Sequence, residues 1–319
     1  MRRETDQMHD AVERIGRAMG FATKREVSIS PGADCEGYAP RLDVAWFRAL
    51  TLPQRNALKQ VGARPPVIAG SLIVAGWEVE GSDVSTRGTQ ANLANIRVSG
   101  AAYGFVALRG GTENNLHERA RKAARTQRHY FGAQDAIVLD ARWLEKLAGR
   151  SWAPDPVSPA SANGKSTPTT DGGEGDWADA RRKLRNLGEA AGFDVTESYR
   201  SRLARDRNLT TSKIDMVWSL PMPRGLYQLA AHITDLAKDR FDEPLLPERF
   251  DHAAVVAFEL ENGSAKHAHG ALLNLASHAM SGVFVAGNPM AAEAAEAAEM
   301  TYRDVFPLSR VTINTDYMK

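Results

Sequence analysis

The residues best suited to chemistry in this chain are two pairs of glutamates, Glu78 with Glu80 and Glu259 with Glu261. Each pair ends an apolar run with the character of a buried strand. Side chains at positions i and i+2 of a strand point to the same face, so the two carboxylates of each pair would stand side by side. Such like charges are costly to bury unless a cation lies between them or one carboxyl holds a proton. The pattern therefore predicts a divalent-metal site, present twice.

An aspartate opens an earlier apolar run in each half, Asp43 in the first and Asp215 in the second, and both belong to an Asp-x-x-Trp motif. A single Glu-x-Glu at a strand end carries little weight, because solvated strands often produce it. Two copies behind matching aspartate strands favour a real site. The alternative is that both glutamate pairs stand at solvent-facing ends of their strands, and it predicts that the carboxylates point into bulk water.

The two halves align over more than their acidic residues. A Gly-x-x-x-Gly-Phe motif occurs at Gly16–Phe21 and again at Gly188–Phe193, and 23 positions separate its second glycine from the aspartate in both halves. Asn92-Leu-Ala is matched with Asn274-Leu-Ala further along the chain. These repeats predict an internal duplication, with one copy in each domain.

The elements that would position these residues form two domains of a mixed α/β (α+β) fold, each with the core order α-β-β-β-α-β. We place the first domain at residues 1–150, a flexible linker rich in Pro, Ser and Gly at residues 151–176, and the second domain at residues 177–319. Hydrophobic periodicity predicts helices at residues 10–19, 86–98, 113–130, 143–148, 177–191, 227–241, 269–280 and 290–302. It predicts strands at residues 23–29, 41–48, 71–80, 103–108, 135–140, 213–220, 253–261, 282–287 and 310–315.

The length, composition and net charge of the chain are those of a globular protein. The 319 residues can bury two cores, and 43% apolar and 25% charged residues do not describe a disordered chain. With a net charge of +1, any polyanion binding must come from local basic patches. One cysteine, Cys35, excludes an intrachain disulfide and suits a reducing compartment. We expect neither a signal peptide nor a membrane span, and a cytoplasmic location.

The order of elements and the acidic motifs together resemble the restriction-endonuclease-like PD-(D/E)XK nuclease superfamily. The resemblance covers residues 8–140 and 177–315, which is essentially both halves. Two departures stand out. The lysine of the family motif is replaced by Glu80 and Glu261, a variant found in some members, and no proline precedes Asp43 or Asp215.

The resemblance implies an Mg²⁺ or Mn²⁺ ion in each copy, since carboxylate and carbonyl oxygens suit hard cations. The metal ligands would be Asp43, Glu78 and the carbonyl of Val79 in the first copy, and Asp215, Glu259 and the carbonyl of Leu260 in the second. Glu80 and Glu261 could each act as a general base or hold a second ion.

The copies are not equivalent at the first helix. Some relatives place a glutamate of this helix in the site, and Glu13 could serve in the first copy, although it could equally be a solvated helix residue. Its counterpart in the second copy is Arg185. One copy could therefore be catalytic and the other degraded.

Nucleic-acid contacts would come from basic surfaces, which suit phosphate groups but are also ordinary solvated faces. The residues that we assign to such contacts are Arg87, Arg121, Arg125, Arg128, Lys213 and Lys266. Of these, Lys213, Lys266 and Arg87 could also take the place of the missing motif lysine. The sequence does not separate DNA from RNA.

Two functions of different classes follow. The first is a metal-dependent DNA endonuclease that hydrolyses phosphodiester bonds, with a role in restriction or phage defence implied by the resemblance. The second is a catalytically inactive nuclease-fold protein that acts in DNA binding or complex assembly. A homodimer and partner subunits both remain open.

Overall fold

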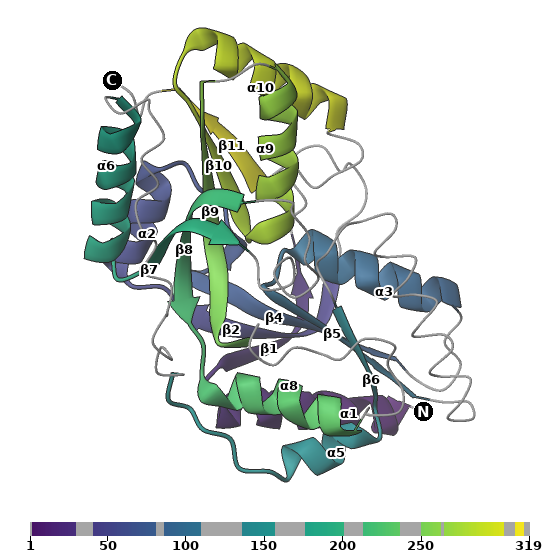
Figure 1. Ribbon diagram of the computed structural model, residues 1–319. Helices are drawn as coiled ribbons and strands as arrows, with labels where there is room; N and C mark the ends of the chain where they lie inside the picture. The colour runs from purple at the N-terminus through teal and green to yellow at the C-terminus, as the bar shows by residue number, and fades with distance from the viewer. Residues whose placement is uncertain are drawn as a thin grey trace. The chain divides into compact units, whose positions relative to one another are not determined.

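The computed structural model describes residues 2–29, 41–80, 86–109, 136–156, 176–200, 213–236, 250–262, 265–302 and 310–315. Within these ranges the chain forms two mixed sheets with helices beside them (Figure 1). This is the α+β fold predicted from the sequence, and both copies have the predicted core order α-β-β-β-α-β, with an extra helix between the second and third core strands. The chain divides into two compact units, each drawn from three segments.

Unit 1 comprises residues 1–49, 71–157 and 222–251, and its sheet has the order β1-β2-β4-β5-β6. The strands β1, β2 and β4 are antiparallel, whereas β4, β5 and β6 are parallel. Its elements are α1 (Arg2–Ala18), β1 (Ala22–Ser28), β2 (Arg41–Ala49), β4 (Ser71–Glu80), α3 (Thr86–Ser99), β5 (Tyr103–Leu108), β6 (Ala136–Asp140), α5 (Trp143–Ala148) and α8 (Arg224–Leu236).

Unit 2 comprises residues 50–70, 158–221 and 252–319, and its sheet has the order β11-β10-β9-β8-β7. Again three strands, β7, β8 and β9, are antiparallel, and β9, β10 and β11 are parallel. Its elements are α2 (Leu52–Gln60), β3 (Val67–Ile68), α6 (Asp176–Ala190), β7 (Asp194–Arg200), β8 (Lys213–Pro221), β9 (His252–Glu261), α9 (Ala265–His278), β10 (Ser281–Ala286), α10 (Pro289–Tyr302) and β11 (Val311–Asn314).

Two helices are assigned to a unit other than the one that holds their neighbours in sequence. The segment of α2 belongs to unit 2, where Gln54 Nε2 donates to the Gly192 carbonyl at 3.4 Å and Thr312 Oγ1 donates to the Gly62 carbonyl at 2.8 Å. The segment of α8 belongs to unit 1, where Phe250 stacks on Tyr103 with ring centroids 4.8 Å apart. Helix α2, which begins with a capping box at Thr51, is not among the helices predicted from the sequence.

The core of unit 1 is aromatic. Trp46 on β2 and Trp77 on β4 lie 5.1 Å apart between ring centroids, and Phe105 on β5 stacks on Trp77 at 4.2 Å. Helix α1 approaches this cluster through Gly16, where a Cβ would lie 2.6 Å from Trp46 Nε1. Only a residue without a side chain allows the helix to come so close.

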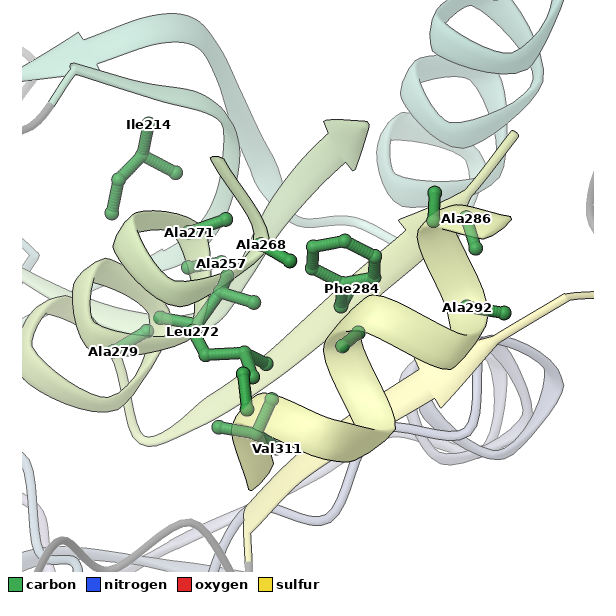
Figure 2. Packing of buried hydrophobic residues seen from close by; sticks show 14 of the residues in the cluster. Ile214, Ala257, Ala268, Ala271, Leu272, Ala279, Phe284, Ala286, Ala292 and Val311 are labelled. Atoms are coloured by element: carbon green, nitrogen blue, oxygen red, sulfur yellow. The ribbon is translucent and has the colours of Figure 1, made fainter. Parts of the chain in front are cut away.

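The core of unit 2 repeats this close approach and adds a layer of small residues. A Cβ at Gly188 on α6 would again lie 2.6 Å from an indole nitrogen, that of Trp218 on β8. Around Phe284, alanines of α9 and α10 bring the two helices close to β10 (Figure 2). The members of this cluster include Ala257, Ala268, Ala271, Leu272, Ala292, Ala295 and Val311.

Some sequence predictions need correction, and others fall where nothing is described. Helix α9 begins at Ala265, four residues before the predicted start at residue 269, so His267 and His269 both lie on it. The expected basic helix at residues 113–130 and most of the expected linker lie outside the described residues. Within the described part of the chain, no helix is long and apolar enough to cross a membrane.

Candidate functional site

The strand register of unit 1 brings the first aspartate and glutamate together. Val44 pairs with Trp77 across the antiparallel strands β2 and β4, so the next positions along the ladder are Asp43 and Glu78. Residues opposite each other on one face have Cβ atoms about 5 Å apart. Asp43 Oδ2 also accepts a hydrogen bond from the Val79 backbone N–H at 2.7 Å. Asp43 is partly buried, and Glu78 is only 4% exposed.

Burial changes the electrostatics of this pair. It raises the pKa of Glu78 to about 9, with a further increase from the neighbouring charge of Asp43, while a hydrogen bond from Asn95 acts in the opposite direction. Burial also raises the pKa of Asp43, and the Val79 N–H and the charge of His9 oppose that rise. At neutral pH the pair therefore holds a proton on Glu78 unless a cation compensates its charge.

Helix α3 supplies two asparagines to the glutamates of β4. Asn92 Nδ2 donates to Glu80 Oε1, and Asn95 bonds to Glu78. In unit 2, Asn274 Nδ2 donates to Glu259 Oε1 at 3.4 Å. The partner of the first glutamate is thus Asn95 in one unit and Asn274 in the other. The match of Asn92 with Asn274 made from the sequence is therefore wrong by about one helical turn.

Two residues near the unit 1 site were missed by the sequence analysis. His9 on α1 is 7% exposed and lies close enough to Asp43 for its charge to lower the pKa of that carboxyl. Glu26 on β1 raises the pKa of both Asp43 and Glu78. Its φ of +53° lies in the left-handed region, and its carboxylate forms an ion pair with Arg41 at 2.7 Å. The sequence gives no direct signal for His9, because it precedes the predicted start of the first helix at residue 10.

Glu13, the glutamate of the first helix, forms ion pairs with two arginines. Its carboxylate accepts hydrogen bonds from Arg17 at 3.0 Å and from Arg25 at 2.9 Å, and Thr23 lies at 3.4 Å. These ion pairs join α1 to β1 and satisfy the carboxylate there. On α1, the residue whose charge lowers the pKa of Asp43 is His9, four residues before Glu13.

Unit 2 repeats the geometry of the acidic pair. Met216 pairs with Phe258, which places Asp215 opposite Glu259, and the Leu260 N–H donates to Asp215 Oδ2 at 3.0 Å. Glu259 is 6% exposed. Burial, then the charge of Asp215, raises the pKa of Glu259 to about 8, against the hydrogen bond from Asn274.

The surroundings of the two acidic pairs differ. In unit 2 the guanidinium of Arg181 on α6 donates to Asp215 Oδ1 at 2.9 Å. Each unit also has an ion pair between this helix and the next strand, with the charges exchanged. In unit 1, Glu13 on α1 binds Arg25 on β1. In unit 2, Arg185 on α6 binds Glu197 on β7. Ser198, with φ +51°, stands at the irregular position that Glu26 occupies in unit 1.

The predicted metal ligands meet as pairs rather than as larger sets. Asp43 lies with Glu78 and Asp215 with Glu259, while the N–H groups of Val79 and Leu260 bind the aspartates. Glu80 and Glu261 end the same strands. Among the described residues, no group of three or more His, Cys, Asp or Glu side chains is arranged to hold a metal ion. Any ion would complete its shell with backbone oxygens, water or substrate.

An unsatisfied buried oxygen marks the unit 1 pair. Glu78 Oε1 and His9 Nε2 are buried without a hydrogen-bond partner among the described residues, and neither Asp215 nor Glu259 has such an atom. A buried polar atom without a partner is costly and calls for an explanation such as a missing ion or water. The oxygen donors present therefore fit a hard cation at unit 1.

The predicted nucleic-acid contacts are only partly described. Lys213 begins β8 and is exposed. Arg87 lies on α3 and Lys266 on α9, but their side chains are not among the described parts of the structure. Arg121, Arg125 and Arg128 lie outside the described residues. The basic run on α6 is engaged internally, since Arg181, Arg182 and Arg185 each form an ion pair with an acidic side chain.

No protein-family model, curated protein or solved structure matches the chain. Its function is therefore inferred from the fold and the geometry of the acidic pairs.

Proposed function

We propose that the chain is a divalent-metal-dependent DNA endonuclease whose reaction takes place at the acidic pair of unit 1. The single observation that carries the proposal is the buried pair of Asp43 and Glu78, in which Glu78 Oε1 has no partner among the described residues. The mixed sheet, with Asp on one strand and Glu-x-Glu on the next, supports a phosphodiester hydrolase of the restriction-endonuclease-like kind.

The residues of the site would have two roles, metal binding and proton transfer. Asp43, Glu78 and the Val79 carbonyl would hold an Mg²⁺ or Mn²⁺ ion, which supplies charge stabilisation at the phosphate under attack. Glu78 must release its proton for this role, because its pKa is about 9 before any cation binds. Glu80, held by Asn92, would take the proton of the attacking water as the water oxygen bonds to phosphorus and the bond from phosphorus to the leaving sugar oxygen breaks.

The experiment is a plasmid-cleavage assay with purified full-length chain in Mg²⁺, in Mn²⁺ and in EDTA. We expect cleavage that requires the divalent ion and that falls at least about a hundredfold in Asp43→Asn, because loss of a ligating charge removes both ion and transition-state stabilisation. Glu145→Gln, an exposed change on α5, is the matched control. Absence of cleavage under all metal conditions, or an undiminished rate in Asp43→Asn, contradicts the proposal.

A catalytically inactive nuclease-fold protein that acts in DNA binding or complex assembly is the second candidate. It is favoured by the lack of a three-residue metal group among the described residues. It predicts DNA binding that is indifferent to EDTA and to Asp43→Asn. We further propose a cytoplasmic location for the chain, and a restriction or phage-defence role for the first candidate.

A further inference from the structure

The helix that opens each copy of the repeat, α1 in unit 1 and α6 in unit 2, presents a different residue at one equivalent position. His9 lies seven residues before Gly16, and Arg181 lies seven residues before Gly188. Both glycines contact the tryptophan of the following aspartate strand with the same closest distance, 2.6 Å from a built Cβ to the indole nitrogen. Both residues also act on that strand's aspartate, His9 on Asp43 through its charge and Arg181 through an ion pair.

In unit 2 this position supplies a positive charge from the protein itself. Arg181 Nη2 lies 2.9 Å from Asp215 Oδ1, and the other oxygen of Asp215 accepts from the Leu260 N–H. Glu259 Oε1 accepts from Asn274. A fixed guanidinium next to a carboxylate favours the ionised form and repels a second cation. The acidic pair of unit 2 is therefore compensated without a metal.

In unit 1 the residue at the same position, His9, acts on Asp43 only through its charge and gives no guanidinium ion pair like that of Arg181. His9 is 7% exposed and Glu78 is 4% exposed. His9 Nε2 and Glu78 Oε1 are both buried and have no hydrogen-bond partner among the described residues. A further carboxylate, Glu26, acts on this pair, where unit 2 has Ser198. Glu26 is itself ion-paired with Arg41 at 2.7 Å, so the charge that distinguishes the two sites is the guanidinium of Arg181, which unit 1 lacks.

We infer that the residue at this position decides which acidic pair takes a divalent cation, so that the chain binds one ion, at unit 1, and unit 2 is a metal-free lobe. The inference rests on the proposed metal role of Asp43 and Glu78. At an effective dielectric constant between those of the protein surface and water, one opposing unit charge a few ångströms away weakens cation binding by about ten- to a hundredfold.

Titration calorimetry with Mn²⁺ on the full-length chain tests the inference without any substrate. We expect one ion per wild-type chain and two per Arg181→His chain, in which the affinity of unit 2 rises at least tenfold. Asp215→Asn added to Arg181→His should remove the second ion and leave the first. Arg182→His is the matched control, because Arg182 lies on the same helix and its ion pair is with Asp179. It should bind one ion. Arg181 is 45% exposed in its side chain, so its replacement should not prevent folding.

The outcomes separate this inference from the proposed function. Two ions in the wild type, or no ion gained by Arg181→His, overturns the inference whether or not DNA is cleaved. A chain that binds no ion as wild type but one as Arg181→His supports the role of position 181 and contradicts the proposed metal site of unit 1. One ion in the wild type with no cleavage of DNA contradicts only the proposed hydrolysis.

Discussion

Glu78 is the residue at which stability and chemistry conflict most directly. A carboxyl that is 4% exposed, beside a second carboxyl, with one oxygen lacking a partner in the described structure, is an unfavourable arrangement for folding alone. Proteins tolerate such groups where function requires them. The sequence could predict that the glutamates of β4 and β9 stand at the end of buried strands, because the apolar runs before them are unambiguous. It could not predict His9 or Arg181, because their proximity to the aspartates depends on how α1 and α6 cross the sheets.

The pKa of Glu78 gives the stability of the chain a definite dependence on pH. Because the pKa is about 9 in the folded chain against an ordinary 4.5, the folded state holds this proton more tightly than the unfolded state. The stabilisation that comes from this proton on Glu78 is therefore fully present below pH 4.5. It is lost, and the free energy of unfolding falls, as the pH rises toward 9.

Glu78→Gln keeps the size of the side chain and removes the charge. In EDTA we expect it to raise the free energy of unfolding at pH 8 by roughly 1–3 kcal/mol and to leave it nearly unchanged at pH 5. Urea denaturation at the two pH values measures the difference. Glu189→Gln, an exposed change on α6, should have little effect at either pH. A Glu78→Gln chain no more stable than wild type at pH 8 would show that the burial of this charge is not costly.

At the scale of elements, the strands are the part of the fold that the sequence predicts best. The run from Ser71 to Glu80 and the run from Tyr103 to Leu108 predict β4 and β5 with their observed bounds. Continuous apolar runs with clear ends leave little freedom in placing a central strand. Helix α1 begins earlier than predicted, at Arg2, because its first turns are polar and have no hydrophobic period to mark them.

The glycines of α1 and α6 offer a test of how these helices meet the sheets. In Gly16→Ala and Gly188→Ala the new methyl group would lie 2.6 Å from the indole nitrogen of the tryptophan below it. We expect each to lower the free energy of unfolding by about 1–3 kcal/mol through overpacking, although alanine favours a helix by about 1 kcal/mol.

Gly270→Ala on α9 is the matched control, because a Cβ there meets nothing within 4 Å. It should stabilise the chain slightly, by up to about 1 kcal/mol. Thermal unfolding of the three variants measures the contrast. Equal effects at Gly16 and Gly270 would mean that α1 does not depend on its contact with Trp46.

At the scale of the whole molecule, each compact unit includes a helix from the connection between two strands of the other sheet. Unit 1 takes in residues 222–251, and unit 2 takes in residues 50–70. The sequence predicts the duplication but not this assignment, because the apolar face of a helix does not identify the surface that it will cover. In unit 1, the Gly225 N–H bonds to the Ala153 carbonyl at 2.8 Å, and Phe250 stacks on Tyr103.

This assignment predicts that the chain cannot be cut between its copies without loss of structure. A fragment of residues 1–157 lacks α8 and Phe250, so the face of Tyr103 and the edge of Phe105 would be exposed to water. We expect this fragment to aggregate or to show poorly dispersed amide signals in NMR spectra. Co-expression with residues 158–319 should restore dispersion. A well-folded isolated fragment would contradict the reciprocal composition of the units.

The most direct test of the account compares the two aspartates in one cleavage assay. Single-turnover rates on plasmid DNA in Mn²⁺ are measured for wild type, Asp43→Asn and Asp215→Asn. We predict that Asp43→Asn lowers the rate at least about a hundredfold and that Asp215→Asn changes it less than about threefold, since the guanidinium of Arg181 already serves the second aspartate. Equal losses in the two variants, or a loss confined to Asp215→Asn, would contradict the account.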